Sequence, residues 1–186
     1  MEWRPNTHLI WPKILNDEHI RKLDYVIQNN YVGFENPDSP ADGKVTTTKV
    51  VSYDTLFQFK EVEDLYKTAE DKISYHFGYD IFPYTSYSNS IYNEYHAEAG
   101  GKYDWHIDCS NHPKWDIKMS LIINLSESFT GGEFQLFSEN GETPIKEFSE
   151  PGTMILFKSH IMHRVTPVTS GIRRTLTFFF GGPAFR

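Results

Sequence analysis

Cysteine is almost absent from this sequence, since Cys109 is the only one among 186 residues. A single thiol excludes an internal disulfide framework and a zinc site built from several cysteines. It also agrees with a reducing compartment. The first residues, from Met1 to Pro5, lack the basic start and apolar stretch of a secretory signal. We therefore expect a cytoplasmic protein.

Long apolar runs and basic clusters are missing as well. No stretch approaches the length of about 20 apolar residues that a membrane-spanning helix needs, so we expect no membrane span. Lys and Arg number 18 against 25 Asp and Glu, which gives a formal charge of −7. Basic residues never cluster beyond pairs such as Arg173-Arg174. Nucleic-acid binding, which depends on a basic surface, is therefore disfavoured.

Aromatic residues are abundant, with 14 Phe, 11 Tyr and 4 Trp, which suits a packed interior lined by rings. The length fits one domain over residues 1–186, and no linker composition divides it. We expect residues 1–80 to form a helical support and residues 81–186 to form a β core.

Two segments have apolar residues at helical spacing. The first covers residues 16–30 behind the capping candidate Asn16, and the second covers residues 60–77 with Gly78 as its stop. Residues 33–44 are rich in Pro, Gly and acidic side chains, which predicts a loop. The Thr- and Val-rich residues 45–53 predict a strand.

Short β-like runs separated by Gly, Pro and Asn follow Gly78. The predicted strands are residues 84–95, 103–108, 117–125, 133–137, 145–148, 153–157, 163–168 and 173–180. Many short strands at close spacing indicate an antiparallel sandwich or barrel. We therefore expect a mainly β fold with flanking helices, arranged around a jelly-roll-like core.

His106 and Asp108 are the first candidate metal ligands. Residues two apart on a strand point to the same side, so an imidazole and a carboxylate could share one cation. The same pair also fits a strand end on a solvated face. His160 and His163 compete for the third position. We favour His163, because it begins a predicted strand, whereas His160 follows Ser159 in a predicted turn.

Arg173 follows His163 after the turn at residues 169–171, and a hairpin there would place the two strands side by side. Arg173 and Arg174 point to opposite faces, so at most one can enter the interior. A buried arginine is costly unless a carboxylate meets it. We favour Arg173, because Thr175 and Thr177 share its face. The alternative has Arg173 at the surface and Arg174 buried against a structural acid.

Two imidazoles and one carboxylate form the ligand set that leaves iron(II) with open positions for a co-substrate and dioxygen. An arginine nearby can hold the distant carboxylate of an organic acid with its planar fork of donors. A structural zinc site would need a fourth protein ligand, which His160 would have to supply.

Three motifs together resemble the 2-oxoglutarate- and Fe(II)-dependent dioxygenases, most of all the prolyl 4-hydroxylase and PKHD-type group. They are residues 103–108 (YDWHID), residues 131–134 (GGEF) and residues 163–173 (HRVTPVTSGIR). The resemblance covers about residues 84–182. It implies a double-stranded β-helix, which is a jelly-roll fold, with the site at its open end.

The resemblance also implies roles for individual residues. His106, Asp108 and His163 match the iron ligands. Arg173 matches the residue that binds the 5-carboxylate of 2-oxoglutarate, and Thr177 matches an assisting hydroxyl. Tyr95 matches a tyrosine of the co-substrate pocket. Because the stretch from Tyr95 to His106 is one residue longer than the commonest family spacing, Tyr92 stays open as the alternative.

The implied activity is hydroxylation of a prolyl residue in a peptide or protein. Dioxygen and 2-oxoglutarate are the co-substrates, Fe(II) is the metal, and ascorbate is a candidate further cofactor. The alternatives are a hydroxylase of a free amino acid or another small molecule, and a non-catalytic β-barrel binding module. Residues 33–44 are a candidate substrate lid, and Trp115 is a candidate wall of the entrance.

Overall fold

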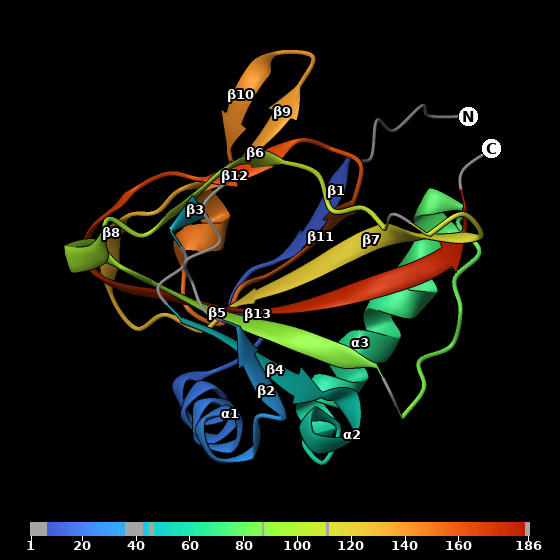
Figure 1. Ribbon diagram of the computed structural model, residues 1–186, viewed down its shortest axis with the longest axis horizontal. Coiled ribbons are helices and arrows are strands. Elements are labelled where there is room, and N and C mark those ends of the chain that lie inside the picture. The colour runs from blue at the N-terminus through green and yellow to red at the C-terminus, as the bar shows by residue number, and fades with distance from the viewer. Residues whose placement is uncertain (1–6, 36–42, 45–46, 87, 111, 185–186) are drawn as a thin grey trace.

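The computed structural model describes residues 7–35, 43–44, 47–86, 88–110 and 112–184. Its helices cover one face of a large antiparallel sheet, and a smaller antiparallel sheet faces the other side (Figure 1). The helices are α1 (Asp17–Asn30), α2 (Tyr53–Leu56) and α3 (Lys60–Lys72), with a π-helical turn at Ile73–Phe77 and 3-10 turns at Ala97–Ala99 and Lys146–Ser149.

The larger sheet has the order β1-β11-β7-β13-β5-β4-β2, and β8 pairs with β13 beside this path. Its strands are β1 (His8–Trp11), β2 (Gly33–Glu35), β4 (Thr47–Ser52), β5 (Asn89–His96), β7 (Trp115–Asn124), β8 (Phe129–Gly131), β11 (Met154–Lys158) and β13 (Val168–Pro183). Strands from the first 80 residues thus extend the β core as well.

The smaller sheet has the order β10-β9-β12-β6-β3. Its strands are β3 (Gly43–Lys44), β6 (Lys102–His106), β9 (Phe134–Ser138), β10 (Gly141–Pro144) and β12 (His163–Val165). The β9–β10 hairpin projects away from the rest of the molecule in Figure 1.

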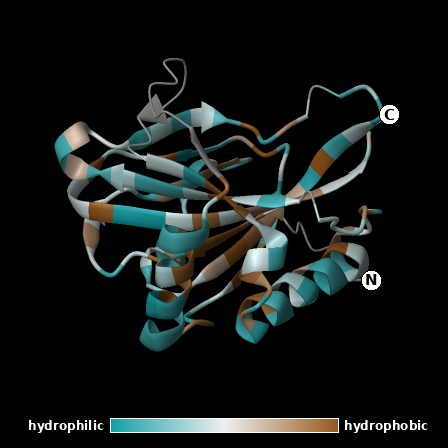
Figure 2. Cartoon of the chain, turned by 60° about the horizontal axis from the view of Figure 1, so that its bottom comes forward, coloured by the Kyte–Doolittle hydropathy of each residue, from teal (hydrophilic) through white to brown (hydrophobic). Residues whose placement is uncertain are grey.

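Helix α1 begins where the sequence predicts it. The Asn16 side chain accepts a hydrogen bond of 2.9 Å from the backbone N–H of His19, and Asp17 and Glu18 fill the first turn. Ile20, Leu23 and Ile27 are its buried residues. Hydrophilic and hydrophobic positions alternate along the helices, as expected for segments with one side on a sheet (Figure 2).

The predicted second helix also ends as expected. Its last turn widens into the π-helical segment at Ile73–Phe77, and Gly78 then takes a left-handed conformation with a φ of 66°. Together α1, α2 and α3 cover one face of the larger sheet, where Leu121, Leu176 and Phe178 belong to the same hydrophobic cluster.

A second hydrophobic cluster lies between the two sheets. It includes Phe134 and Leu136 from β9, Ile122 from β7 and Phe157 from β11. Side chains alternate along each strand, so the larger sheet supplies residues to both clusters. The candidate site also lies between the two sheets, where polar side chains from both sheets line a cavity.

One strand prediction is wrong, and another is too long at its start. Residues 145–148 form no strand, because a 3-10 turn at Lys146–Ser149 places Ile145 and Phe148 on one side of the chain with both side chains buried. The strand predicted at residues 84–95 begins only at Asn89.

The predicted hairpin between His163 and Arg173 is also wrong. Strand β12 pairs with β6 and β9 in the smaller sheet, whereas β13 pairs with β5, β7 and β8 in the larger one. Thr166 and Pro167 lie between them, outside either strand, where the chain crosses from one sheet to the other. His163 and Arg173 therefore meet across the inter-sheet layer instead of side by side.

The candidate lid lies largely outside the described residues, at residues 36–42. Its ends are short strands instead of loop: Gly33–Glu35 pairs with β4, and Gly43–Lys44 pairs with β6. Among the described residues, none of the helices has both the length and the apolar character needed to cross a membrane.

Candidate metal centre and co-substrate cavity

A cavity of about 130 Å³ lies between the two sheets. Both sheets contribute side chains to its wall. The lining residues are Ile91, Asn93, Tyr95, Tyr103, His106, Asp108, Ile122, Phe134, His163, Val165, Arg173, Thr175, Thr177 and Phe179. All six residues that the sequence proposed for the metal and the co-substrate are among them.

His106, Asp108 and His163 form the only group of three or more potential metal ligands found in the part of the chain that the structure describes. One ligand atom from each lies within 4.8 Å of the others. The Nε2 atom of His106 is 3.9 Å from Oδ1 of Asp108, and Nε2 of His163 is 3.6 Å from Oδ2. These spacings leave room for one cation between the three side chains.

Asp108 reaches this group by a bend of the chain, since β6 ends at His106. Its backbone N–H donates a hydrogen bond of 2.9 Å to the carbonyl oxygen of Ser159, in the turn after β11. The predicted strand therefore extended two residues too far. The side chain nevertheless lies beside His106, as strand alternation had suggested.

Both histidines present their Nε2 atoms to the cavity. Nδ1 of His106 lies 2.7 Å from the carbonyl oxygen of Asp104, and Nδ1 of His163 lies 3.0 Å from that of Ile161. A carbonyl oxygen only accepts hydrogen bonds, so Nδ1 is the donor in each ring and Nε2 is the nitrogen left to bind a metal. This arrangement is typical of histidines that bind a metal.

Burial supports the neutral form of His163. Its side chain is 4% exposed, and burial lowers its pKa although the Asp108 carboxylate acts in the opposite direction. A neutral imidazole is the form that binds a metal. The donor set of two imidazoles and one carboxylate, with no thiolate, fits iron(II).

His160 is not part of the group. It lies in the turn after β11, its side chain is exposed, and it does not line the cavity. No fourth ligand joins the three within the described ranges. A closed structural zinc site, which normally has four protein ligands, is therefore not supported.

Arg173 enters the same cavity from β13. Its side chain is 2% exposed, and no carboxylate of the described residues forms an ion pair with it. Its guanidinium lies 5.3 Å from the ring centre of Tyr95 and 5.7 Å from that of Phe148. Burial lowers its pKa to about 10, so the group stays charged at neutral pH. A buried charge of this kind calls for an anionic ligand.

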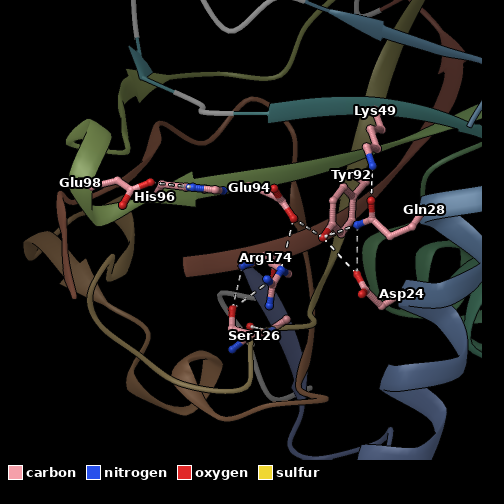
Figure 3. Close-up of polar contacts among 10 residues, drawn as sticks. Asp24, Gln28, Lys49, Tyr92, Glu94, His96, Glu98, Ser126 and Arg174 are labelled. Atoms are coloured by element: carbon pink, nitrogen blue, oxygen red, sulfur yellow. Dashed lines mark hydrogen bonds and ion pairs between the residues drawn. The ribbon is translucent and has the colours of Figure 1, made fainter. Parts of the chain in front are cut away.

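Arg174 points to the opposite face of β13. Its Nε atom donates a hydrogen bond of 3.2 Å to Glu94, and Tyr92 donates one of 2.8 Å to the same carboxylate (Figure 3). Oδ1 of Asp24 lies 3.1 Å from the same hydroxyl and competes for its single proton. Arg174 thus meets a structural acid, and Arg173 alone reaches the cavity.

The same alternation separates Tyr95 from Tyr92. Tyr95 lines the cavity beside Arg173, whereas Tyr92 belongs to the polar network on the helix side of the sheet. Burial raises the pKa of Tyr95 to about 12, so its phenol keeps its proton at neutral pH. Thr177 also lines the cavity. The geometry favours Tyr95 over Tyr92, and the binding roles of Tyr95 and Thr177 stay predictions.

Sequence reasoning gave no role to Tyr103 and Ser120, which lie beside the metal ligands. The Tyr103 ring centre lies 4.1 Å from that of His106, and the Ser120 hydroxyl donates a hydrogen bond of 2.5 Å to Asp108. Ser120 carried a signal, because it is the polar residue within the apolar run from Met119 to Ile123. Trp115, the candidate entrance wall, stacks on His112 at 5.8 Å and does not line the cavity.

Comparison with known proteins agrees with this geometry. Residues 90–181 match the model of the 2OG-Fe(II) oxygenase superfamily. A PKHD-type hydroxylase from Pseudoalteromonas atlantica is 30% identical over 129 residues, which cover 63% of this chain and 53% of that protein. The chain thus spans about half the length of this curated relative, and 35% of a PKHD-type hydroxylase from Synechococcus is covered.

Solved structures show the same fold. A viral collagen prolyl hydroxylase from Paramecium bursaria chlorella virus-1, in complex with 2OG, has a TM-score of 0.69 at 16% identity and covers 96% of this chain and 97% of its own. A prolyl hydroxylase from Trichoplax adhaerens, in complex with a hypoxia inducible factor peptide fragment, has a TM-score of 0.69 at 17% identity, with coverages of 95% and 84%. The predicted mainly β jelly-roll core is confirmed.

Proposed function

Because the chain belongs to the 2OG-Fe(II) oxygenase superfamily, we propose that it is an iron(II)- and 2-oxoglutarate-dependent dioxygenase that hydroxylates a prolyl residue in a peptide or protein. The observation that carries this proposal is one cavity with two complementary features. His106, Asp108 and His163 are grouped in its wall, and Arg173 lines the same cavity, buried and without an ion-paired carboxylate among the residues that the structure describes. A dicarboxylate that binds a metal at one end and a guanidinium at the other fits both.

His106, Asp108 and His163 would hold the iron. When bound, iron(II) and 2-oxoglutarate couple oxidative decarboxylation of the 2-oxo acid to hydroxylation of a substrate C–H bond by dioxygen. The three side chains contribute a single negative charge, from Asp108, so the centre can accept a dianionic co-substrate. The hydrogen bonds from Nδ1 to the carbonyl oxygens of Asp104 and Ile161 fix the orientation of both imidazoles.

Arg173 would bind the distant carboxylate of 2-oxoglutarate. Its planar guanidinium can donate two parallel hydrogen bonds to a carboxylate, and its burial strengthens this attraction. The Tyr95 phenol, which keeps its proton, and the Thr177 hydroxyl can donate further hydrogen bonds from the same wall. These donors would hold the co-substrate in one orientation.

Apolar side chains would limit the access of water to the reacting groups. Ile122, Phe134, Val165 and Phe179 line the same cavity as the metal ligands and Arg173. A dry wall strengthens the electrostatic interactions within the site and restricts side reactions. The cavity is therefore suited to bind a small charged acid while the substrate approaches from outside.

The choice of a prolyl substrate rests on the relatives. The structural neighbours from the chlorella virus and from Trichoplax are named as prolyl hydroxylases, and the second contains a bound peptide. The sequence relatives carry the broader name PKHD-type hydroxylase. We therefore propose a peptide or protein as the substrate partner, with the prolyl ring as the site of hydroxylation.

The proposal is tested by adding Fe(II) and then 2-oxoglutarate to the protein without oxygen, and recording its visible spectrum. A metal-to-ligand charge-transfer band should appear only when both are present. Oxygen is then admitted, with ascorbate, and succinate is measured with a library of proline-containing peptides and with matched peptides that carry Ala instead. Succinate release should rise with a proline peptide, which should gain one oxygen atom by mass spectrometry.

The controls separate the two parts of the proposal. A protein that binds no Fe(II), or shows no band with 2-oxoglutarate, would contradict the oxygenase assignment itself. A normal band with succinate release that rises only with free proline, or with another small molecule, would refute the peptide substrate and leave the chemistry in place.

A further inference from the structure

Ser120 makes a direct contact between the larger sheet and the metal ligands. Its hydroxyl donates a hydrogen bond of 2.5 Å to Oδ2 of Asp108. Ser120 lies on β7 in the larger sheet, whereas Asp108 follows β6 of the smaller one. The bond therefore joins the two sheets at the candidate metal centre.

Burial of the Ser120 hydroxyl would be unfavourable without the Asp108 carboxylate as its hydrogen-bond partner. The residue is fully buried, and in the antiparallel register it is paired with Phe157 on one side and Phe179 on the other. Burying a hydroxyl in such surroundings is unfavourable unless it makes a hydrogen bond. The Asp108 carboxylate satisfies the hydroxyl, and the charge on the acceptor makes the bond a strong one.

A second hydrogen bond fixes the backbone of Asp108. Its N–H donates to the carbonyl oxygen of Ser159, and the Ser159 hydroxyl donates a bond of 2.5 Å to the carbonyl oxygen of Ile117. Ile117 and Ser120 are both on β7. The main chain and the side chain of Asp108 are thus both tied to one rigid strand, which defines the position and the rotation of the carboxylate.

The two oxygens of this carboxylate are not equivalent. Oδ2 accepts the Ser120 hydroxyl and lies 3.6 Å from Nε2 of His163, whereas Oδ1 lies 3.9 Å from Nε2 of His106. A carboxylate that bound the metal through both oxygens would occupy one of the positions that this ligand set leaves open. The Ser120 hydrogen bond uses one lone pair of Oδ2 and restricts the rotation of the carboxylate, which limits the ways in which it can bind a metal.

We propose that Ser120 is a positioning residue whose hydrogen bond to Oδ2 fixes the rotation of the Asp108 carboxylate beside His106 and His163, so that the carboxylate is held ready to bind the metal. The proposal rests on the iron site of the proposed function and adds to it a residue outside the three ligands. Partners of metal ligands at this distance typically change metal affinity by about 10- to 100-fold when they are replaced.

The test compares Ser120→Ala with Ser90→Ala. Ser90 is also fully buried on a strand, β5, but its hydroxyl donates to the carbonyl oxygen of Val51, away from the site. Binding of Mn(II), a stable substitute for Fe(II), is measured by electron paramagnetic resonance without 2-oxoglutarate. The visible spectrum of bound Co(II) reports the ligand arrangement, and thermal unfolding without metal reports the stability of each variant.

Ser120→Ala should bind Mn(II) about 10- to 100-fold more weakly than the wild type, with a changed Co(II) spectrum. Ser90→Ala should lose stability but keep the wild-type affinity and spectrum. An Mn(II) affinity of Ser120→Ala within twofold of the wild type, with an unchanged Co(II) spectrum, would overturn the role of Ser120 alone. A wild-type protein that binds neither metal would overturn the proposed function, and this inference with it.

Discussion

His106 and His163 are direct cross-strand partners on β6 and β12, with ring centres 4.1 Å apart. Their Nδ1 atoms both donate to backbone carbonyls, so both Nε2 atoms are directed towards Asp108. Two imidazoles at this distance would repel each other if both were protonated. A metal ion bound between the two Nε2 atoms and Asp108 avoids this repulsion, because a metal-binding imidazole is neutral.

This relationship predicts that Asp108→Ala abolishes metal binding. The variant would lose the only anionic ligand of the group, and two neutral imidazoles hold Fe(II) weakly. Iron content, measured after anaerobic loading and gel filtration, should fall below one tenth of the wild-type value, and succinate formation should disappear with it. Asp104→Ala is the matched control, because Asp104 is exposed and pairs with Lys102. Full iron content in Asp108→Ala would refute the ligand assignment.

Arg173 and Arg174 allow a prediction about the co-substrate. Arg173→Lys removes the planar fork, and hydrogen bonds to charged groups contribute about 1.5–3 kcal/mol. The KM for 2-oxoglutarate should therefore rise by about 10- to 100-fold. Steady-state kinetics at saturating Fe(II) measures this change. An unchanged KM would exclude Arg173 as the carboxylate anchor.

The leucine variants of the same two residues separate binding from stability. Arg173→Leu removes a buried charge that has no carboxylate partner among the described residues, so the free energy of unfolding without ligand should stay level or rise. Arg174→Leu breaks the ion pair with Glu94, so its stability should fall while its affinity for 2-oxoglutarate is retained. Urea unfolding and ligand titration measure the two effects. A stability loss in Arg173→Leu as large as that in Arg174→Leu would point to a structural role for Arg173.

The sequence predicted the members of the site better than the way they meet. Residue type and order were enough to propose His106, Asp108, His163 and Arg173, and the structure places all four on one cavity. The hairpin that was to join His163 to Arg173 does not exist. The alternation of side chains along a strand is local and can be predicted from the sequence. The passage of the chain from one sheet to the other at Pro167 depends instead on which distant strands pair with β12 and β13.

The missed residues have a similar explanation. Ser120 is 12 residues from Asp108 and on the other sheet, so its contact depends on tertiary packing. The strand predicted at residues 145–148 failed because Ile145 and Phe148 suit a buried strand and a 3-10 turn equally well by composition. Tyr95 could be separated from Tyr92 only when the face of β5 that lines the cavity was known.

Gly132 provides a prediction about the space around Arg173. Its φ is 59°, and a Cβ atom at this position would lie 3.0 Å from Cδ of Arg173 and 2.9 Å from Cγ2 of Val168. Gly132→Ala should therefore displace the arginine and raise the KM for 2-oxoglutarate several-fold. Gly141→Ala is the control, because its φ is 82° but no atom lies within 4 Å of the added carbon.

Both glycine variants should lose about 1–2 kcal/mol of stability from the left-handed backbone conformation. Only Gly132→Ala should change the binding of the co-substrate. Calorimetric titration of 2-oxoglutarate into the Mn(II) form checks this difference. Equal affinities in the two variants would show that the arginine tolerates the added carbon.

The network around Glu94 predicts an acid-sensitive contribution to stability (Figure 3). Burial would raise the pKa of Glu94, but hydrogen bonds from His96, Tyr92 and Arg174 lower it below the usual value of 4.5. A carboxyl group whose pKa is lower in the folded state stabilises the protein above the unfolded pKa. That stability is lost as the pH falls through the folded value. The free energy of unfolding should therefore decrease below about pH 4.5.

Glu94→Gln isolates this contribution. The variant cannot release a proton at this position, so it should be less stable than the wild type at pH 7, and the difference should shrink as the pH falls below 4.5. Urea unfolding at a series of pH values measures it. Glu139→Gln, at an exposed position after β9, should give a curve parallel to that of the wild type. A difference between Glu94→Gln and the wild type that stayed constant in acid would mean that the lost hydrogen bonds, and not the charge, hold β5 against β13 and α1.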